Sequence, residues 1–132
     1  MIKCILVKID NSFSVVELPD DNTFNDEVYK LLDCTCWEGV NTALSLYMLV
    51  DENGKISKSK KDINFLASLL TLFPLENYVL GDVPNDAICG DVLISKVRRN
   101  EYGECALVSL TDIDIKQMSF LLEETLEVIK ES

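Results

Sequence analysis

Two apolar runs near the start of the chain are separated by only three polar residues, and this spacing constrains the fold more than any other feature. Residues 2–9 include several β-branched side chains, and residues 13–18 form a second apolar run after the turn-prone tripeptide Asp10-Asn11-Ser12. Apolar runs joined by such a short turn are typical of a β-hairpin. The sequence therefore predicts an antiparallel sheet that begins with the first residues.

Two segments in the middle of the chain predict further strands. One strand is expected to begin at Cys34, and the almost wholly apolar residues 44–50 predict a central strand. The second run stops at Asp51-Glu52-Asn53-Gly54, where the Asn-Gly pair supplies the positive φ angles of a tight turn.

A second hairpin is predicted towards the end of the chain. Residues 88–97 read as a strand, in which Gly90 marks a bulge or a close approach of the backbone. A turn through residues 100–104 then leads back into the apolar residues 105–108.

Three segments predict helices. Thr23 or Asn25 is placed to cap the first, whose apolar face consists of Val28, Leu31 and Leu32. Asp62 is placed to cap the second, whose apolar face consists of Phe65, Leu66, Leu69 and Leu70. Thr111 is placed to cap the third, whose apolar face consists of Ile115, Met118, Leu122, Leu126 and Ile129.

The length of the chain fits a single core. With 132 residues, of which 48 % are hydrophobic, the chain can bury one core but is too short for two ordinary domains. We therefore expect residues 1–132 to form a single α+β domain. It would have a mainly antiparallel sheet built from hairpins, two or three helices, and a C-terminal amphipathic helix packed on the sheet.

The expected compartment is a reducing cytoplasm. Lys8 interrupts the first apolar run and no small-residue cleavage site follows, so this run does not resemble a signal peptide. No window approaches the roughly 18 apolar residues of a membrane span. Five cysteines without an export signal then favour free thiols in a cytosol.

The charge argues against a nucleic acid as the direct partner. The chain has 23 acidic and 12 basic residues and a formal charge of -11, which repels phosphates. A protein with a basic face fits better, including one whose nucleic-acid groove this chain would occupy by charge mimicry. Residues 10–27 hold six acids and no lysine or arginine, and the predicted interaction face consists of Asp20, Asp21, Asp26 and Glu27. The simpler alternative is a solvated acidic surface.

The absence of histidine argues against catalysis. Without histidine the chain lacks the usual general base and the commonest metal ligand. No local spacing groups carboxylates, lysines or tyrosines as a substitute, so we predict no catalytic residue, no cofactor and no enzymatic activity.

The cysteines leave a metal site and a core role open. In a strand, Cys34 and Cys36 would project to one face. A metal site would need two more ligands from Cys4, Cys89 and Cys105, and no Cys-x-x-Cys pair is present. We therefore favour cysteines that fill the core as small apolar residues, and no metal site.

Two further features have a functional and a structural interpretation. A basic patch for a phosphate or a nucleotide would consist of Lys55, Lys58, Lys60, Lys61, Arg98 and Arg99, if these residues lie at one end of the sheet. No glycine-rich cradle accompanies them, so a solvated loop is the simpler interpretation. Trp37 is either a partly buried core residue, which we favour, or a surface anchor for a partner.

The sequence also resembles an uncharacterised family common in bacteriophages and mobile elements of Gram-positive bacteria, the domain of unknown function family 3846. The matching stretches are residues 47–55, 64–67, 87–94 and 109–112. The resemblance implies a phage or mobile-element origin, in which small acidic proteins often bind and inhibit a host protein. It implies no catalytic residues.

These observations favour a non-enzymatic acidic protein that binds or inhibits a host protein in the bacterial cytosol, including a protein of a defence system. The alternative is a small-ligand or nucleotide-binding protein that uses the lysine and arginine patch. A carboxylate-based enzyme is the third hypothesis, and it would need two acids with perturbed pKa values in one cleft. No membrane partner is expected, and exposed sheet edges would permit a homodimer.

Overall fold

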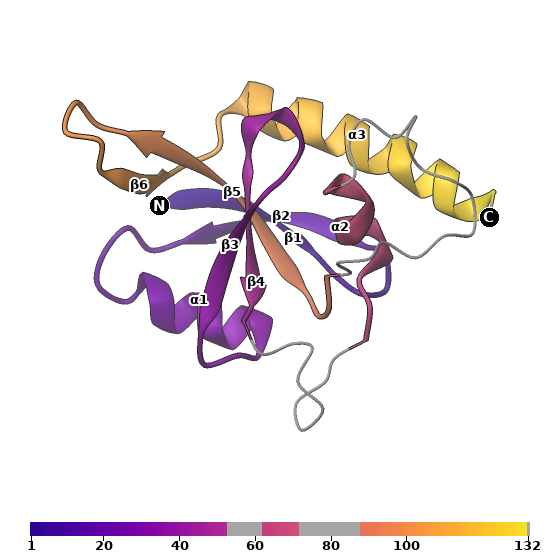
Figure 1. Ribbon diagram of the computed structural model, residues 1–132, viewed down its shortest axis with the longest axis horizontal. Helices are drawn as coiled ribbons and strands as arrows, with labels where there is room; N and C mark the ends of the chain where they lie inside the picture. Colours follow the sequence, from indigo (N-terminus) through magenta and orange to yellow (C-terminus); the bar gives the residue numbers. More distant parts are fainter. Residues whose placement is uncertain (53–61, 72–87, 132) are drawn as a thin grey trace.

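The computed structural model describes residues 1–52, 62–71 and 88–131, and within these residues the chain forms six strands and three helices (Figure 1). The strands are β1 (Ile2–Val7), β2 (Phe13–Leu18), β3 (Trp37–Asn41), β4 (Tyr47–Asp51), β5 (Val92–Arg99) and β6 (Cys105–Val108). The helices are α1 (Phe24–Leu32), α2 (Phe65–Leu70) and α3 (Asp112–Lys130), and a short 3-10 turn covers Ala43–Ser45. The predicted α+β class is confirmed.

The strands form one antiparallel sheet in the order β2-β1-β5-β4-β3, and β6 pairs with the end of β5. Both predicted hairpins are present. In the first, the register runs from Ile2 opposite Leu18 to Val7 opposite Phe13. Its turn works because Asn11 adopts a φ of 69°, which asparagine tolerates better than most residues, and because the Asp10 carboxylate accepts hydrogen bonds from Ser12.

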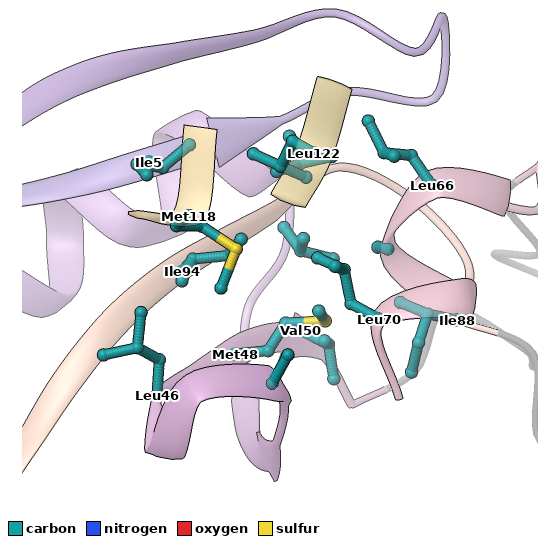
Figure 2. Close-up of a cluster of buried hydrophobic side chains, with 14 of the residues drawn as sticks. Ile5, Leu46, Met48, Val50, Leu66, Leu70, Ile88, Ile94, Met118 and Leu122 are labelled. Atoms are coloured by element: carbon teal, nitrogen blue, oxygen red, sulfur yellow. The ribbon is translucent and has the colours of Figure 1, made fainter. Parts of the chain in front are cut away.

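Helices cover both faces of the sheet, and Figure 1 shows α1 and α3 on opposite sides. Strand side chains alternate between the two faces, so each face has its own core. On one face, Ile5, Met48 and Ile94 pack with Leu66 of α2 and with α3 (Figure 2). On the other face, the buried side chains are Ile2, Cys4, Leu6, Leu18, Val28, Leu32, Leu49 and Leu93.

The C-terminal helix matches its prediction. Met118 and Leu122 are fully buried, and Ile115, Leu126 and Ile129 pack around them. At its N-terminus, the Thr111 side chain accepts a hydrogen bond from the Asp114 N–H, and the Asp114 carboxylate accepts one from the Thr111 N–H. This reciprocal capping box satisfies two backbone donors that a helix start leaves unpaired.

Four predicted boundaries are wrong, and in two of them a left-handed residue is the cause. The strand predicted from Cys34 begins only at Trp37, because Asp33 has a φ of 49° and ends α1 with a left-handed residue. The strand predicted over residues 44–50 begins only at Tyr47, because Leu44 and Ser45 have φ angles of 62° and 60°. These angles belong to a turn, although Leu and Ser are unusual there.

The third wrong boundary is the start of α2. Its N-cap is Asn64, not Asp62, and Phe65 on the predicted apolar face is 43 % exposed. The fourth wrong boundary belongs to the strand predicted over residues 88–97, because β5 begins only at Val92 and continues to Arg99. Gly90 precedes it with a φ of 86° and donates its N–H to the Asp62 carbonyl oxygen, so the predicted close backbone approach is present but lies outside the strand. The predicted Asn53-Gly54 turn falls outside the described residues.

A buried polar network centred on Asn64 joins α2 to the sheet. The Asn64 side-chain amide is fully buried, and it donates hydrogen bonds to the carbonyl oxygens of Val7 and Gly90, each at 3.0 Å. Its oxygen accepts from the Ala67 N–H at 3.0 Å and so caps α2. The backbone N–H of Asn64 donates to the Ile88 carbonyl oxygen at 2.8 Å. One side chain therefore connects the end of β1, the approach to β5 and the start of α2.

Asn64→Ala should lower the free energy of unfolding by about 3 kcal/mol, because it removes a helix cap and two buried hydrogen bonds to the carbonyl oxygens of Val7 and Gly90. Urea unfolding followed by circular dichroism measures the loss. Asn25→Ala is the matched control, since it removes one exposed hydrogen bond, to Trp37, and should cost well under about 1 kcal/mol. Equal losses in the two variants would contradict the role assigned to the network.

Asp114 should make stability depend on pH. Burial opposes its charge, but the hydrogen bonds from the Thr111 backbone and from Lys96, at 3.0 Å, outweigh burial and lower the pKa of Asp114. A lowered folded-state pKa stabilises the fold above the ordinary aspartate pKa of about 3.9, and this stabilisation is lost as the pH falls through the folded value.

Asp114→Asn should therefore cost about 1 kcal/mol at neutral pH, and the difference from the wild type should shrink at pH 3. The measurement is urea unfolding at both pH values. Asp112→Asn changes an acid in the same helical turn whose side chain is 97 % exposed, and it should have little effect at either pH. A pH-independent cost of Asp114→Asn would show that its charge does not matter.

Candidate functional site

An acidic segment covers the connection from β2 to α1 and the first turn of α1. Asp20, Asp21 and Asp26 are exposed, and Glu27 is half-buried. Glu27 pairs with Lys30 at 3.2 Å, and Lys30 is the single lysine or arginine in residues 9–52, a range with ten acidic residues. The structure thus places the four predicted acids close together along the chain, with one basic neighbour in this part of the sequence.

Asp21 differs from its neighbours because it has a structural role. Its carboxylate accepts hydrogen bonds from the Thr23 hydroxyl at 2.6 Å and from the Thr23 N–H at 2.8 Å. These two bonds lower the pKa of Asp21. Thr23 precedes α1 as predicted, but its side chain makes no capping hydrogen bond, so Asp21 orders the chain there instead. Asp20 and Asp26 are therefore better positions at which to change charge without disturbing the fold.

Trp37 lies beside this segment. Its indole N–H donates to the Asn25 side chain in the first turn of α1 at 3.0 Å, and its ring is half-buried against the α1-side core. The ring also lines a groove, so Trp37 has partly buried and partly accessible surface. The partly buried core role that the sequence favoured is confirmed, and part of the ring stays accessible in the groove.

The groove has a volume of about 590 Å³. It lies on the α1 side of the sheet, between the start of β4 and the β5–β6 hairpin. Its lining includes Trp37, Asn41, Ser45, Tyr47, Val97, Arg99, Cys105 and Leu107. The Tyr47 ring lies directly over Gly39, and a side chain at Gly39 would displace it. Glycine at this position therefore allows the aromatic ring to form the floor of the groove.

Only two residues of the predicted basic patch, Arg98 and Arg99, lie within the described residues. Arg98 and Arg99 are exposed at the end of β5, whereas Lys55, Lys58, Lys60 and Lys61 fall outside the described part of the chain.

The cysteines fall into two groups, and the expectation that all of them fill the core is wrong. Cys4 and Cys89 are buried, but Cys36 and Cys105 are exposed. Cys34 is half-buried, and because it precedes β3 the argument that Cys34 and Cys36 share a strand face does not hold. Within residues 1–52, 62–71 and 88–131, no three acidic or cysteine residues lie close enough together to hold a metal ion.

The local surroundings of Cys4 and Cys36 also change the pKa values of their thiols. Burial raises the pKa of Cys4 to about 12. A hydrogen bond to the Glu52 carboxylate, together with its negative charge, raises the pKa of Cys36 although that thiol is exposed. Since the thiolate is the reactive form, neither residue is an activated nucleophile.

Sequence reasoning missed the groove and an exposed apolar patch. The groove forms where two hairpins diverge, and no local pattern marks such a place. The patch contains Phe120, 66 % exposed on α3, together with Leu44 and Leu121. Phe120 lies opposite the predicted apolar face of α3, and a single aromatic residue there is too weak a signal to indicate a surface.

No family model, curated protein or solved structure matches this chain. The resemblance to the phage and mobile-element family therefore stays a prediction. In the described part of the chain, no helix is both long enough and apolar enough to cross a membrane.

The cysteines should react with iodoacetamide in a set order in the folded protein. Cys105 should react first because it is exposed, and Cys36 more slowly because its pKa is raised, while Cys4 and Cys89 should react only on unfolding. Mass spectrometry of peptides from timed samples measures the order. In urea all five thiols should react at similar rates, and rapid labelling of Cys4 in the folded protein would contradict its burial.

Proposed function

We propose that this protein is a non-enzymatic interaction protein that binds another protein through its acidic β2–α1 segment. The observation that carries the proposal is the charge asymmetry of residues 9–52, which contain ten acidic residues and one lysine. Three of the acids, Asp20, Asp21 and Asp26, are exposed. The absence of histidine from the sequence supports a role in binding rather than acid–base catalysis.

The expected partner is a protein with a basic surface. Clustered charges of one sign steer an oppositely charged partner and select against acidic competitors. Trp37 would add apolar contact next to the acidic segment, since tryptophan is enriched among residues that dominate binding energies. The resemblance to the phage and mobile-element family adds that the partner is a bacterial host protein, including a nucleic-acid-binding protein of a defence system.

The alternative is a protein that binds a small anion or a nucleotide. It is supported by one observation, that Arg99 and the aromatic residues Trp37 and Tyr47 line the same groove. A guanidinium and aromatic rings suit a phosphate and a base. The acidic segment has no role in this alternative, so the two functions can be separated by experiment.

The test is a pull-down from a Gram-positive bacterial lysate with three forms of the protein. They are the wild type, the variant Asp20→Asn/Asp26→Asn/Glu27→Gln, and the control Glu123→Gln/Glu124→Gln/Glu127→Gln. The control removes three charges from exposed positions of α3. Asp21 is left unchanged because it orders the start of α1.

A partner retained by the wild type and the control, and bound about tenfold more weakly by the β2–α1 variant, would support the proposal. Its affinity should also fall as salt is added. Equal loss in both variants would mean that net charge alone attracts the partner. Native mass spectrometry that finds a retained small molecule, with no protein captured, would favour the alternative.

A further inference from the structure

Strand β5 extends beyond the strand that pairs with it on one side. The ladder between β4 and β5 contains only Leu49 opposite Leu93, Met48 opposite Ile94 and Tyr47 opposite Ser95. Strand β5 continues for four more residues, and β6 pairs with these on its other edge. Among the described residues, no strand therefore pairs with the β4-side edge of β5 after Ser95.

The backbone groups of Val97 and Arg99 point to this open edge. In an antiparallel ladder, residues that exchange hydrogen bonds alternate with residues that do not, so successive peptide groups point to opposite edges. At the β5–β6 turn, the Asn100 N–H donates to the Glu104 carbonyl oxygen, which directs even-numbered residues towards β6. Ser95, Val97 and Arg99 are accordingly directed towards the β4 side, where only Ser95 has a strand partner.

A strained turn keeps β4 away from this edge. If the register of β4 and β5 continued, Ser45 would lie opposite Val97. Instead Leu44 and Ser45 both have positive φ angles, and the Leu46 N–H closes the turn by donating to the Ala43 carbonyl oxygen. Positive φ angles in residues other than glycine are uncommon and cost free energy. Because of this turn, β4 begins only at Tyr47 and has no residue opposite Val97.

The open edge runs along the groove described above. Val97, Arg99 and, across the hairpin, Leu107 contribute side chains to its lining, and Tyr47 and Trp37 contribute aromatic rings. Val97 and Arg99 are two residues apart in a strand, so their side chains project to the same face. Along this face of β5 the groove therefore has an apolar side chain, Val97, and two residues later a guanidinium group, Arg99.

We propose that the groove binds an extended segment of a partner protein, which adds as a strand to the edge of β5 at Val97 and Arg99. Main-chain hydrogen bonds supply affinity in this mode of recognition, and side-chain positions two residues apart supply specificity. The bound segment carries a large apolar residue that packs on Tyr47, Val97 and Leu107. It carries an aspartate or glutamate two positions away, which pairs with the Arg99 guanidinium.

This inference rests on the proposed function in that the partner is a protein, but it uses a different surface from the acidic β2–α1 segment. A second copy of this chain is a poorer occupant, because two molecules with a formal charge of -11 repel each other. The chemistry of the segment also differs from that of a nucleotide, since the recognition uses peptide N–H and C=O groups along an edge.

Hydrogen exchange followed by NMR first tests the edge in the free protein. The amides of Val97 and Arg99 should exchange quickly, whereas the amides of Lys96 and Arg98, which point to β6, should be protected. Protection of Val97 and Arg99 in the free monomer would overturn the inference, because the edge would already be occupied. Protection that appears only with a concentration-dependent dimer would assign the edge to self-association and would overturn it as well.

The second test uses a phage-displayed library of random linear dodecapeptides. Enriched peptides should carry a large apolar residue two positions from an Asp or Glu, and they should protect Cys105 in the groove from alkylation. Val97→Pro removes the N–H that faces the open edge, a loss that an edge strand tolerates, and should weaken peptide binding at least about tenfold. Val97→Thr keeps the N–H and is the matched control.

Charge variants separate this inference from the proposed function. Arg99→Glu should weaken binding of the acidic peptides about tenfold, while Asp20→Asn/Asp26→Asn should not weaken it. Peptides that bind Val97→Pro as well as Val97→Thr, or a library that yields no enriched sequence, would overturn strand addition. The lysate experiment would be unaffected by that result, because it depends on the acidic segment.

Discussion

The side-chain amide of Asn64 is the interaction on which the arrangement of the sheet and α2 most depends. It donates to the carbonyl oxygens of Val7 and Gly90 and accepts from Ala67, so three segments distant in the sequence meet at one fully buried group. Ser68 extends the network, because its hydroxyl donates to the Asn64 carbonyl oxygen and accepts from the Ile88 N–H. Each of these groups would cost free energy if it were buried without a partner, and the network therefore specifies how β1 and the approach to β5 meet α2.

With those segments in place, the sheet separates two surfaces of different character. One face is covered by α2 and α3, whose buried leucines and Met118 close the larger core. The other face is covered by α1, which leaves the region of Trp37, Tyr47 and Leu107 only partly buried. The acidic β2–α1 connection lies beside that uncovered region, because the Trp37 indole bonds to Asn25 at the start of α1. An apolar groove and an acidic segment next to each other suit protein binding better than either would alone.

The sequence predicted the features that depend on neighbouring residues, but it did not predict those that depend on contacts between distant residues. The Asp10-Asn11-Ser12 hairpin and the Thr111 cap were predictable because their hydrogen bonds join residues within four positions of each other. The starts of β3, β4 and α2 were not. Leu44 and Ser45 are not residue types that favour a left-handed turn. Asn64, and not Asp62, caps α2 because it bonds to Val7 and Gly90, which are far away in the sequence. The predicted acids lie together because they are neighbours in the chain, whereas the groove depends on where two hairpins diverge.

By itself, then, the sequence determined the α+β class, the two hairpins, the capped amphipathic α3 and the acidic character of residues 10–27, since each follows from local periodicity, turn chemistry or composition. The tertiary structure alone decided which edge of β5 stays open, that Arg99 and Tyr47 line one groove, and that Cys36 and Cys105 face solvent while Cys4 is buried. These features depend on strand order and register, which are set by packing between residues far apart in the chain and not by the preferences of any one segment.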